Sequence, residues 1–184
     1  MVLSKNMQKL VAGSSTIRKL FEEGIELAKE VGAENVYDFS LGNPAAPVPE
    51  EVKKSIYDIL ENRNANFVHC YMPNAGYPEV REKVAANLNK KYNSSFTKDD
   101  IIMTVGAAGG INCVLRCLLE AEDEVLCFAP FFGEYNSYVM NFGGNLKVVP
   151  ADYETFQLNV EEADKYITER TKAVIINNPN NPTG

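Results

Sequence analysis

The sequence has one histidine, four cysteines and no long apolar run, and each scarcity excludes a class of protein. With His69 alone, a metal site built from several histidines is excluded within this chain. The cysteines are too few and too irregularly spaced for a disulfide framework or a zinc site. Because no stretch reaches about 18 apolar residues, no transmembrane helix is expected.

Positive charge is also scarce, since 18 Lys and Arg face 25 Asp and Glu, giving a net charge of −7. The absence of a basic run argues against nucleic acid as the main partner. The first twenty residues mix charges throughout and lack the apolar centre of a signal peptide, so we expect a cytoplasmic protein. Cys113 and Cys117 lie four residues apart among apolar neighbours, which predicts reduced thiols in the core.

The N-terminal part of the chain has the apolar spacing of helices. Such spacing predicts helices over residues 15–31, 50–61 and 78–92, with residues 62–77 irregular between the last two. Residues 36–41 form a short apolar run that predicts an extended segment. Three prolines follow within residues 43–49 and exclude both regular helix and central strand, so this stretch is the clearest linker.

From Asp100 onward the pattern changes to alternating strands and helices. Apolar runs predict strands at residues 101–105, 124–128, 146–149 and 173–177, and helical spacing predicts helices at residues 107–119, 131–142 and 160–168. Strands separated by helical crossovers form a parallel sheet that is buried on both faces. The fold class is therefore α/β, a mainly parallel sheet with flanking helices.

Three of the expected strands are followed by residues suited to ligand binding, and ligands bind at this edge of open α/β sheets. Residues 105–110 (VGAAGG) place small residues at a helix start, where free N–H groups favour an anion such as phosphate. Phe131 and Phe132 follow the next strand and could stack on a planar ring or simply pack in the core. The chain's last residues, NNPNNPTG, combine amide side chains with rigid Asn-Pro pairs.

Taken together, these motifs resemble those of the pyridoxal-phosphate-dependent aminotransferases of class I/II, the fold type I enzymes. The resemblance covers essentially the whole chain and is most specific in the final motif. The segments that carry it are STIR (15–18), SLGNP (40–44), YMPNAGYPEVR (71–81), TVGA (104–107), DEV (123–125), PFF (130–132) and NPNNPTG (178–184).

The resemblance implies a cofactor, pyridoxal 5'-phosphate, and roles for particular residues. Gly106, Ala107 and Ala108 correspond to the cup whose backbone N–H groups hold the cofactor phosphate. Phe132 corresponds to the ring that stacks on the pyridine face. Asn181 corresponds to the amide that hydrogen-bonds the phenolic oxygen of the cofactor.

Two further roles depend on other parts of the chain. Tyr71 corresponds to the hydroxyl that reaches the phosphate of a neighbouring subunit, which implies a homodimer. Gly42 corresponds to a backbone position beside the substrate carboxylate. By the same resemblance, residues 1–47 are an N-terminal arm and helix of the small domain, and residues 48–184 are the first part of the large cofactor-binding domain.

No catalytic residue is expected in this chain. The family's Schiff-base lysine, its aspartate at the pyridine nitrogen and its arginine for the substrate α-carboxylate all follow the Asn-Pro-Thr-Gly motif, so we expect them after Gly184. Because a binding loop is an unusual place for a domain to end, we expect the chain to be the N-terminal portion of a larger enzyme, inactive alone. Gly109 and Gly110, where the family usually has larger residues, blur any inference about the substrate.

The expected reaction moves an amino group from an amino acid to a 2-oxo acid, with aspartate or aromatic substrates favoured. A carbon–sulfur lyase or a decarboxylase on the same scaffold is an alternative that these residues do not separate. A non-catalytic ligand-binding α/β module is another, although the sequence has neither a Walker lysine nor G-x-G-x-x-G. A cofactor-sensing transcription regulator would need a basic DNA-binding segment, which residues 1–10 do not supply.

Overall fold

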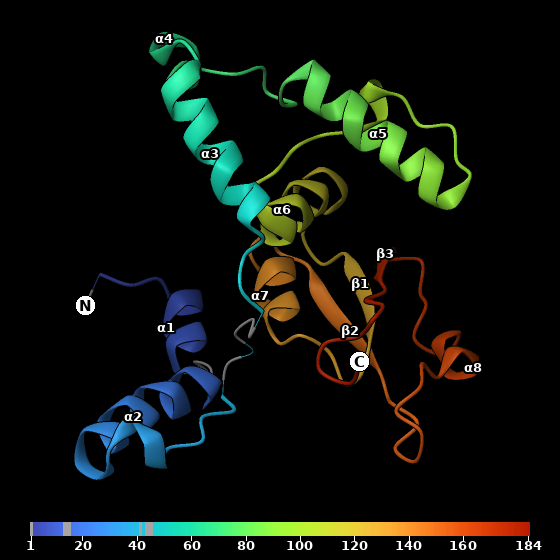
Figure 1. Cartoon of the computed structure of the whole chain (residues 1–184). Helices are drawn as coiled ribbons and strands as arrows, with labels where there is room; N and C mark the ends of the chain where they lie inside the picture. Colours follow the sequence, from blue (N-terminus) through green and yellow to red (C-terminus); the bar gives the residue numbers. More distant parts are fainter. Residues whose placement is uncertain (1, 13–15, 41, 43–45) are drawn as a thin grey trace. The chain divides into compact units, whose positions relative to one another are not determined.

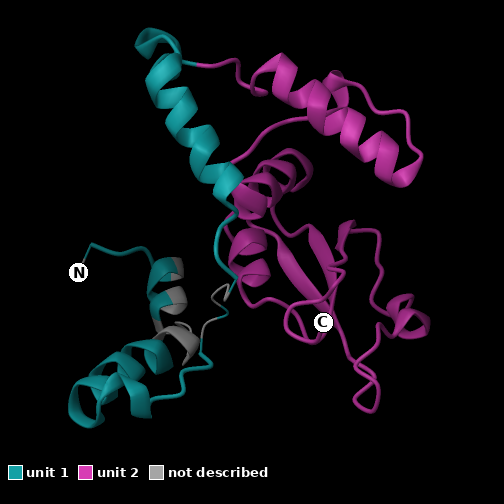
Figure 2. Cartoon of the chain, in the orientation of Figure 1, with its two compact units in different colours: residues 1–71 teal, residues 72–184 magenta. Residues whose placement is uncertain are grey.

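The computed structural model describes residues 2–12, 16–40, 42 and 46–184. The chain divides into two compact units, Met1–Tyr71 and Met72–Gly184, coloured separately in Figure 2. This division by contacts falls after the helix over residues 50–62, later in the chain than the expected boundary at residues 47/48, which remains a prediction. Each unit is described by itself.

The first unit is helical where the sequence predicts helices. Its elements are α1 (Lys5–Ala12), α2 (Thr16–Val31), the 3-10 turn η1 (Ala33–Asn35), α3 (Glu50–Asn62) and α4 (Ala65–Val68) (Figure 1). Residues 36–39 have no regular secondary structure, and Leu41 and residues 43–45 of the expected extended run and linker lie outside the described residues. The short α4 falls in the stretch expected to be irregular, where the Asn64 side chain accepts a hydrogen bond from the N–H of Asn66 at 2.8 Å.

The second unit begins with a long helix, α5 (Pro78–Tyr92), whose ends follow from its sequence. Pro78 occupies the first position, where its missing N–H has no intrahelical partner to lose. Asn93 ends the helix in the left-handed conformation, with φ of 52°. The remaining elements are η2 (Lys98–Asp100), α6 (Gly106–Leu118), β1 (Glu124–Phe128), α7 (Glu134–Met140), β2 (Asn145–Val149), α8 (Val160–Ala163) and β3 (Thr171–Ile175).

The three strands form a parallel sheet in the order β2-β1-β3, as Figure 1 shows. The central strand β1 is buried along all five residues, which explains its unbroken apolar sequence after Glu124. Val125 pairs with Leu146 of β2 on one side and with Ala173 of β3 on the other. The α/β class and the parallel sheet predicted from the sequence are confirmed.

Alternate residues of β1 build two cores on the opposite faces of the sheet. Val125 packs with Leu115 and Leu119 at the end of α6 and with Val139 of α7. Leu126 and Phe128 face the other way, into a cluster with Val149 and Ala163. Helices thus cover both faces, as the sequence predicts for a parallel sheet.

Several element boundaries differ from the sequence-based expectations. Residues 101–104 have no regular structure, so the expected strand at 101–105 is wrong; the backbone N–H of Met103 instead donates to Ala75 O at 2.9 Å. The helix expected over 131–142 is shorter, because the chain leaves β1 through Ala129-Pro130 and begins α7 only at Glu134. The helix expected over 160–168 ends at Ala163 and is followed by turns.

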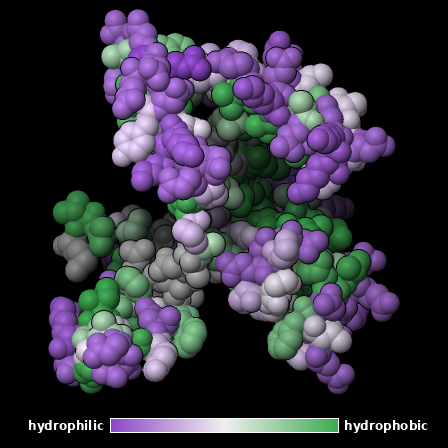
Figure 3. Space-filling view, in the orientation of Figure 1, coloured by the Kyte–Doolittle hydropathy of each residue, from purple (hydrophilic) through white to green (hydrophobic). Residues whose placement is uncertain are grey.

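Large apolar side chains are exposed on both units, as the green areas of Figure 3 show. On α3, Ile56 and Leu60 are more than half exposed. The expectation that Cys113 and Cys117 are core thiols is wrong, since both are exposed, while Cys127 on β1 is the buried cysteine. Cys113 and Cys117 lie on the side of α6 opposite to Leu115, which packs in the core.

Among the described residues, no helix combines the length and the apolar character needed to cross a membrane.

Candidate functional site

The first turn of α6 presents open N–H groups to solvent. Val105, with φ of −80° and ψ of 81°, forms a tight three-residue turn in which the N–H of Gly106 donates to Thr104 O at 3.0 Å. The Thr104 hydroxyl in turn donates to Gly106 O at 3.0 Å. Gly106 has a φ of +68°, which a glycine adopts without strain. Gly106, Ala107 and Ala108 are all exposed, and the N–H groups that follow Gly106 have no partner within the helix.

This turn lies toward the carboxyl edge of the sheet. Residues 119–123 link α6 to β1 so briefly that the helix must run antiparallel to the strand. Leu119, directly after α6, belongs to the same buried cluster as Val125 near the start of β1. Ile111, near the beginning of α6, packs against that cluster, as does Ile175, the last residue of β3. The positive end of a 13-residue helix is therefore directed toward the edge where ligands bind in such sheets.

An aromatic pair follows β1 at this edge. Phe131 stacks on Tyr135 with ring centroids 6.4 Å apart, and Phe132 meets the same ring edge-on at 5.7 Å and 83°. Phe132 remains 38% exposed, so part of its ring is available to a ligand. Burial raises the pKa of the Tyr135 phenol, with smaller contributions from Cys127 and Tyr138, so Tyr135 serves as a neutral support for both phenylalanines.

The loop that follows β3 is tied to the loop that follows β1. The Asn180 side chain donates to Pro130 O at 2.9 Å and to the Thr183 hydroxyl at 2.8 Å. Asn181, its neighbour, is exposed. The sequence analysis assigned a ligand role to Asn181 and missed the bracing role of Asn180. The two asparagines are neighbours in the same motif, and the partner of Asn180 lies 50 residues earlier in the chain.

A hollow of about 450 Å³ lies beside the terminal loop. Its walls come from the loop after β3, including Asn177, Asn178 and Asn180, and from residues 155–158, a segment to which the sequence analysis gave no role. None of the predicted cofactor contacts, Phe132, Asn181 and the first turn of α6, lines this hollow. A hydrogen bond from Asn180 thus joins the loop after β3 directly to the loop after β1. The first turn of α6 lies toward the same edge of the sheet because α6 runs antiparallel to β1.

Gly42 and Tyr71 belong to the first unit. Gly42 is exposed, and a Cβ placed on it would have open space around it. Tyr71 is the last residue of its unit and is fully exposed. Their roles at the substrate carboxylate and at a neighbouring subunit remain predictions.

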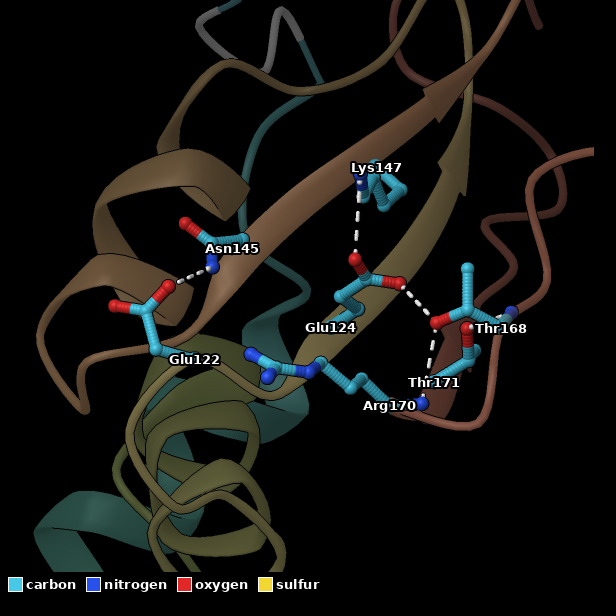
Figure 4. A network of polar contacts seen from close by, with 7 residues as sticks. All are labelled: Glu122, Glu124, Asn145, Lys147, Thr168, Arg170 and Thr171. Carbon is cyan, nitrogen blue, oxygen red and sulfur yellow. Dashed lines mark hydrogen bonds and ion pairs between the residues drawn. The ribbon is translucent and has the colours of Figure 1, made fainter.

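The opposite edge of the sheet holds a polar network of a different kind (Figure 4). Glu124, at the start of β1, accepts a hydrogen bond from the Thr168 hydroxyl at 2.7 Å and lies 3.3 Å from Lys147 Nζ. The Thr168 hydrogen bond, with help from Lys147 and Arg170, lowers the pKa of this carboxyl and outweighs its desolvation. The network connects the starts of the strands, and we assign it to stability.

The carboxyl edge suits a phosphorylated, planar cofactor on three counts. The α6 turn offers N–H donors and the positive end of a helix dipole for a phosphate. The partly open ring of Phe132 offers a surface for an aromatic heterocycle, and the exposed amide of Asn181 offers both a donor and an acceptor. The residues present therefore fit pyridoxal phosphate.

Comparison with known proteins agrees with this geometry. The family described as "Aminotransferase class I and II" matches residues 33–184. The chain belongs to this family. Among its relatives, "Aromatic-amino-acid aminotransferase 2" of Thermococcus litoralis is 37% identical over 187 residues, covering 100% of this chain and 45% of the relative. The "Probable aspartate/prephenate aminotransferase" of Aquifex aeolicus is 35% identical over 160 residues, covering 85% of this chain and 40% of the relative.

Solved structures of aminotransferases have the same fold. An amino transferase from Eubacterium rectale superposes with a TM-score of 0.92 at 40% identity, covering 99% of this chain and 46% of the other. An aspartate aminotransferase mutant from Thermus thermophilus gives 0.86 at 30% identity, covering 100% and 46%. The chain thus spans less than half the length of these aminotransferases.

Proposed function

We propose that the protein to which this chain belongs is a pyridoxal-phosphate-dependent aminotransferase, which moves an amino group from an amino acid to a 2-oxo acid. The observation that carries the proposal is the open first turn of α6, directed toward the sheet edge that also holds Phe132 and the terminal asparagines. Membership in the class I and II aminotransferases supports it. Relatives named for aspartate, prephenate and aromatic amino acids favour substrates of those kinds.

Each residue at this edge has a task that its geometry allows. Gly106 shapes the turn, and the open N–H groups that follow it, beginning with Ala107 and Ala108, hold the phosphate. Phe132 supports the pyridine ring, and Asn181 hydrogen-bonds the phenolic oxygen. Asn180 holds the loop that carries Asn181 against Pro130. When bound, the cofactor supplies an electron sink for the carbanion formed at the substrate Cα.

The remaining parts of the proposal concern the whole protein. The lysine that binds the cofactor is expected beyond Gly184, within a further ~60 residues, because a large domain needs about that much more chain. Tyr71 reaches the phosphate of a second copy in a cytoplasmic homodimer, and Gly42 lies beside the substrate carboxylate. Residues 1–47 belong to the small domain, and residues 48–184 open the large one. The 184 residues alone are inactive and bind the cofactor weakly.

The full-length protein tests this proposal directly. It is mixed with pyridoxal phosphate, L-aspartate or L-tyrosine, and 2-oxoglutarate, and the products are identified. Glutamate formed in equal amount to the new 2-oxo acid supports transamination. Release of a thiol or of carbon dioxide would instead identify the lyase or the decarboxylase, and no cofactor binding at all would point to a non-catalytic module. The same mixture with the 184-residue chain should give no turnover.

A charge placed in the turn tests the phosphate site itself. Ala107→Asp suits the first turn of a helix, because a carboxylate is stabilising there, but it repels a phosphate. We expect the affinity for pyridoxal phosphate to fall roughly tenfold or more, the equivalent of about 1.4 kcal/mol. Ala121→Asp, in the exposed link between α6 and β1, is the matched control and should leave the affinity unchanged.

A further inference from the structure

The segment that leads into the α6 turn is held by an earlier part of the chain, around Ala75. The N–H of Met103 donates to Ala75 O at 2.9 Å. Next to Ala75, Gly76 adopts a φ of +95°, and a Cβ there would lie 2.6 Å from Met103 Cγ. Only a glycine gives both this conformation and this close approach, so Gly76 fixes where Met103 lies.

Arg81, in the first turns of α5, holds the same segment from a second point. Its Nη1 donates to Lys98 O at 2.8 Å and, at a longer 3.4 Å, to Ile101 O. A guanidinium suits this task, because its planar fork of N–H groups makes charge-assisted hydrogen bonds in a fixed geometry.

The carbonyls that Arg81 binds belong to a preformed turn. At η2, Asp100 Oδ2 accepts hydrogen bonds from the N–H of Thr97 at 2.8 Å and from its hydroxyl at 2.9 Å, which closes a capping box. Residues 98–101 are therefore held as one local unit. Arg81 docks that unit on α5.

These contacts end next to the turn that opens α6. Met103 precedes Thr104, and Thr104 supplies both the carbonyl and the hydroxyl that shape the turn at Gly106. Displacement of Met103 therefore moves the first N–H groups of α6. Misplacement of a binding group by about 1 Å can cost two orders of magnitude in function.

We propose that Gly76 and Arg81 are positioning residues for the phosphate-binding turn at Gly106–Ala108. Neither residue is a ligand; each sets the conformation of residues 98–104 and, through them, the direction of the N–H donors. This inference rests on the proposed cofactor, since it assigns the turn to a phosphate.

The test compares two ligands that differ only in the phosphate, using the full-length protein. Arg81→Ala should weaken binding of pyridoxal phosphate at least tenfold while leaving the weaker binding of pyridoxal unchanged. Arg81→Lys keeps a charged donor and should restore much of the loss. Arg116→Ala, an exposed arginine of α6, is the matched control and should change neither affinity. An equal loss for both ligands in Arg81→Ala would overturn the positioning role.

Amide hydrogen exchange gives a readout that needs no cofactor. Arg81→Ala and Gly76→Ala should both speed exchange across residues 101–109 of the free protein and leave β1 unchanged. Unaltered exchange in this segment would refute the proposed linkage, whatever the binding results. If the wild-type protein binds neither ligand but the exchange effect is present, the proposed cofactor fails while the mechanical linkage stands. Should Arg81→Ala not fold, Gly76→Ala takes its place in both measurements.

Discussion

Glu124 Oε1 lies 3.3 Å from Lys147 Nζ, so that a carboxylate at the start of β1 pairs with an ammonium group in β2. Glu124 is 8% exposed and its other oxygen is held by the Thr168 hydroxyl. These contacts link the central strand to β2 and to the turn that precedes β3.

Folding stability should depend on the charge of Glu124. Its pKa in the folded chain is lowered from 4.5 by the Thr168 hydrogen bond and by Lys147, so the charged form is favoured in the folded state. The stabilisation is present above the unfolded-state pKa and is lost as the pH falls through the folded-state value. Urea unfolding from pH 6 to pH 3 should show this loss in the wild type.

Glu124→Gln should lower the free energy of unfolding at pH 6. Between pH 6 and pH 3, the free energy of unfolding should fall less in this variant than in the wild type. Glu122→Gln is the control, because Glu122 lies on the surface with an amide contact to Asn145. A wild-type and a Glu124→Gln protein with parallel pH profiles would contradict the assigned role.

Cys127 should resist alkylation in the folded chain. Burial raises the pKa of its thiol to about 11, so almost none is present as the reactive thiolate at pH 8. Cys70, Cys113 and Cys117 are exposed and should react first. Brief treatment of the 184-residue chain with iodoacetamide, followed by peptide mass mapping, checks the order; equal labelling of Cys127 would show that β1 is not buried in solution.

Leu126 should contribute far more to stability than a half-exposed leucine of α6. It is 1% exposed in the core that it shares with Phe128, Val149 and Ala163, so Leu126→Ala leaves a cavity and should cost about 2–5 kcal/mol. Leu118→Ala removes the same atoms from a side chain that is 46% exposed, and should cost within about 0.5 kcal/mol. Unfolding in urea compares the two, and similar losses would disprove this core.

Asn180 and Asn181 should differ in what they do. Asn180→Ala removes the hydrogen bond to Pro130 O, whose net contribution is about 1 kcal/mol, and should speed amide exchange in the loops at 129–133 and 177–184. Asn181→Ala should leave exchange unchanged. In the full-length protein with bound pyridoxal phosphate, however, it should shift the pH at which the absorption spectrum changes, because the phenolic oxygen loses a donor.

The opposite pattern, in which Asn181→Ala speeds amide exchange and only Asn180→Ala shifts the spectrum, would reverse the two assignments. A matched variant is Asn178→Ala, which alters the same loop at an exposed amide. It should affect neither measurement.

Local sequence patterns predicted the central elements of the second unit well. β1 was predicted because its apolar run is unbroken, as is typical of a central strand. The structure places it between two other strands and buries all five of its residues. α5 was predicted with its bounds, since Pro78 marks its first position and apolar residues recur every four positions. Residues 101–105 were predicted to be a strand for the same apolar character, but Met103 bonds to Ala75 instead and Val105 is 94% exposed. Strand formation depends on an available partner, which local composition does not encode.

The candidate site was predicted in the same uneven way. The small residues at 106–108 and the aromatic pair at 131–132 were visible as motifs, and the structure places them at the start of α6 and at the end of β1. The bracing role of Asn180 was not visible, because its partner Pro130 is 50 residues earlier.

The α/β class, the parallel sheet and the family could be read from the amino-acid sequence, because periodicity, turn residues and the order of motifs are all written along the chain. Three features emerged from the folded chain alone: Asn180 braces the loop, Arg81 holds the segment before α6, and Glu124 is paired at the opposite edge of the sheet. These features depend on groups distant in the chain coming within about 3 Å, the range of a hydrogen bond, and only the packed fold sets such distances.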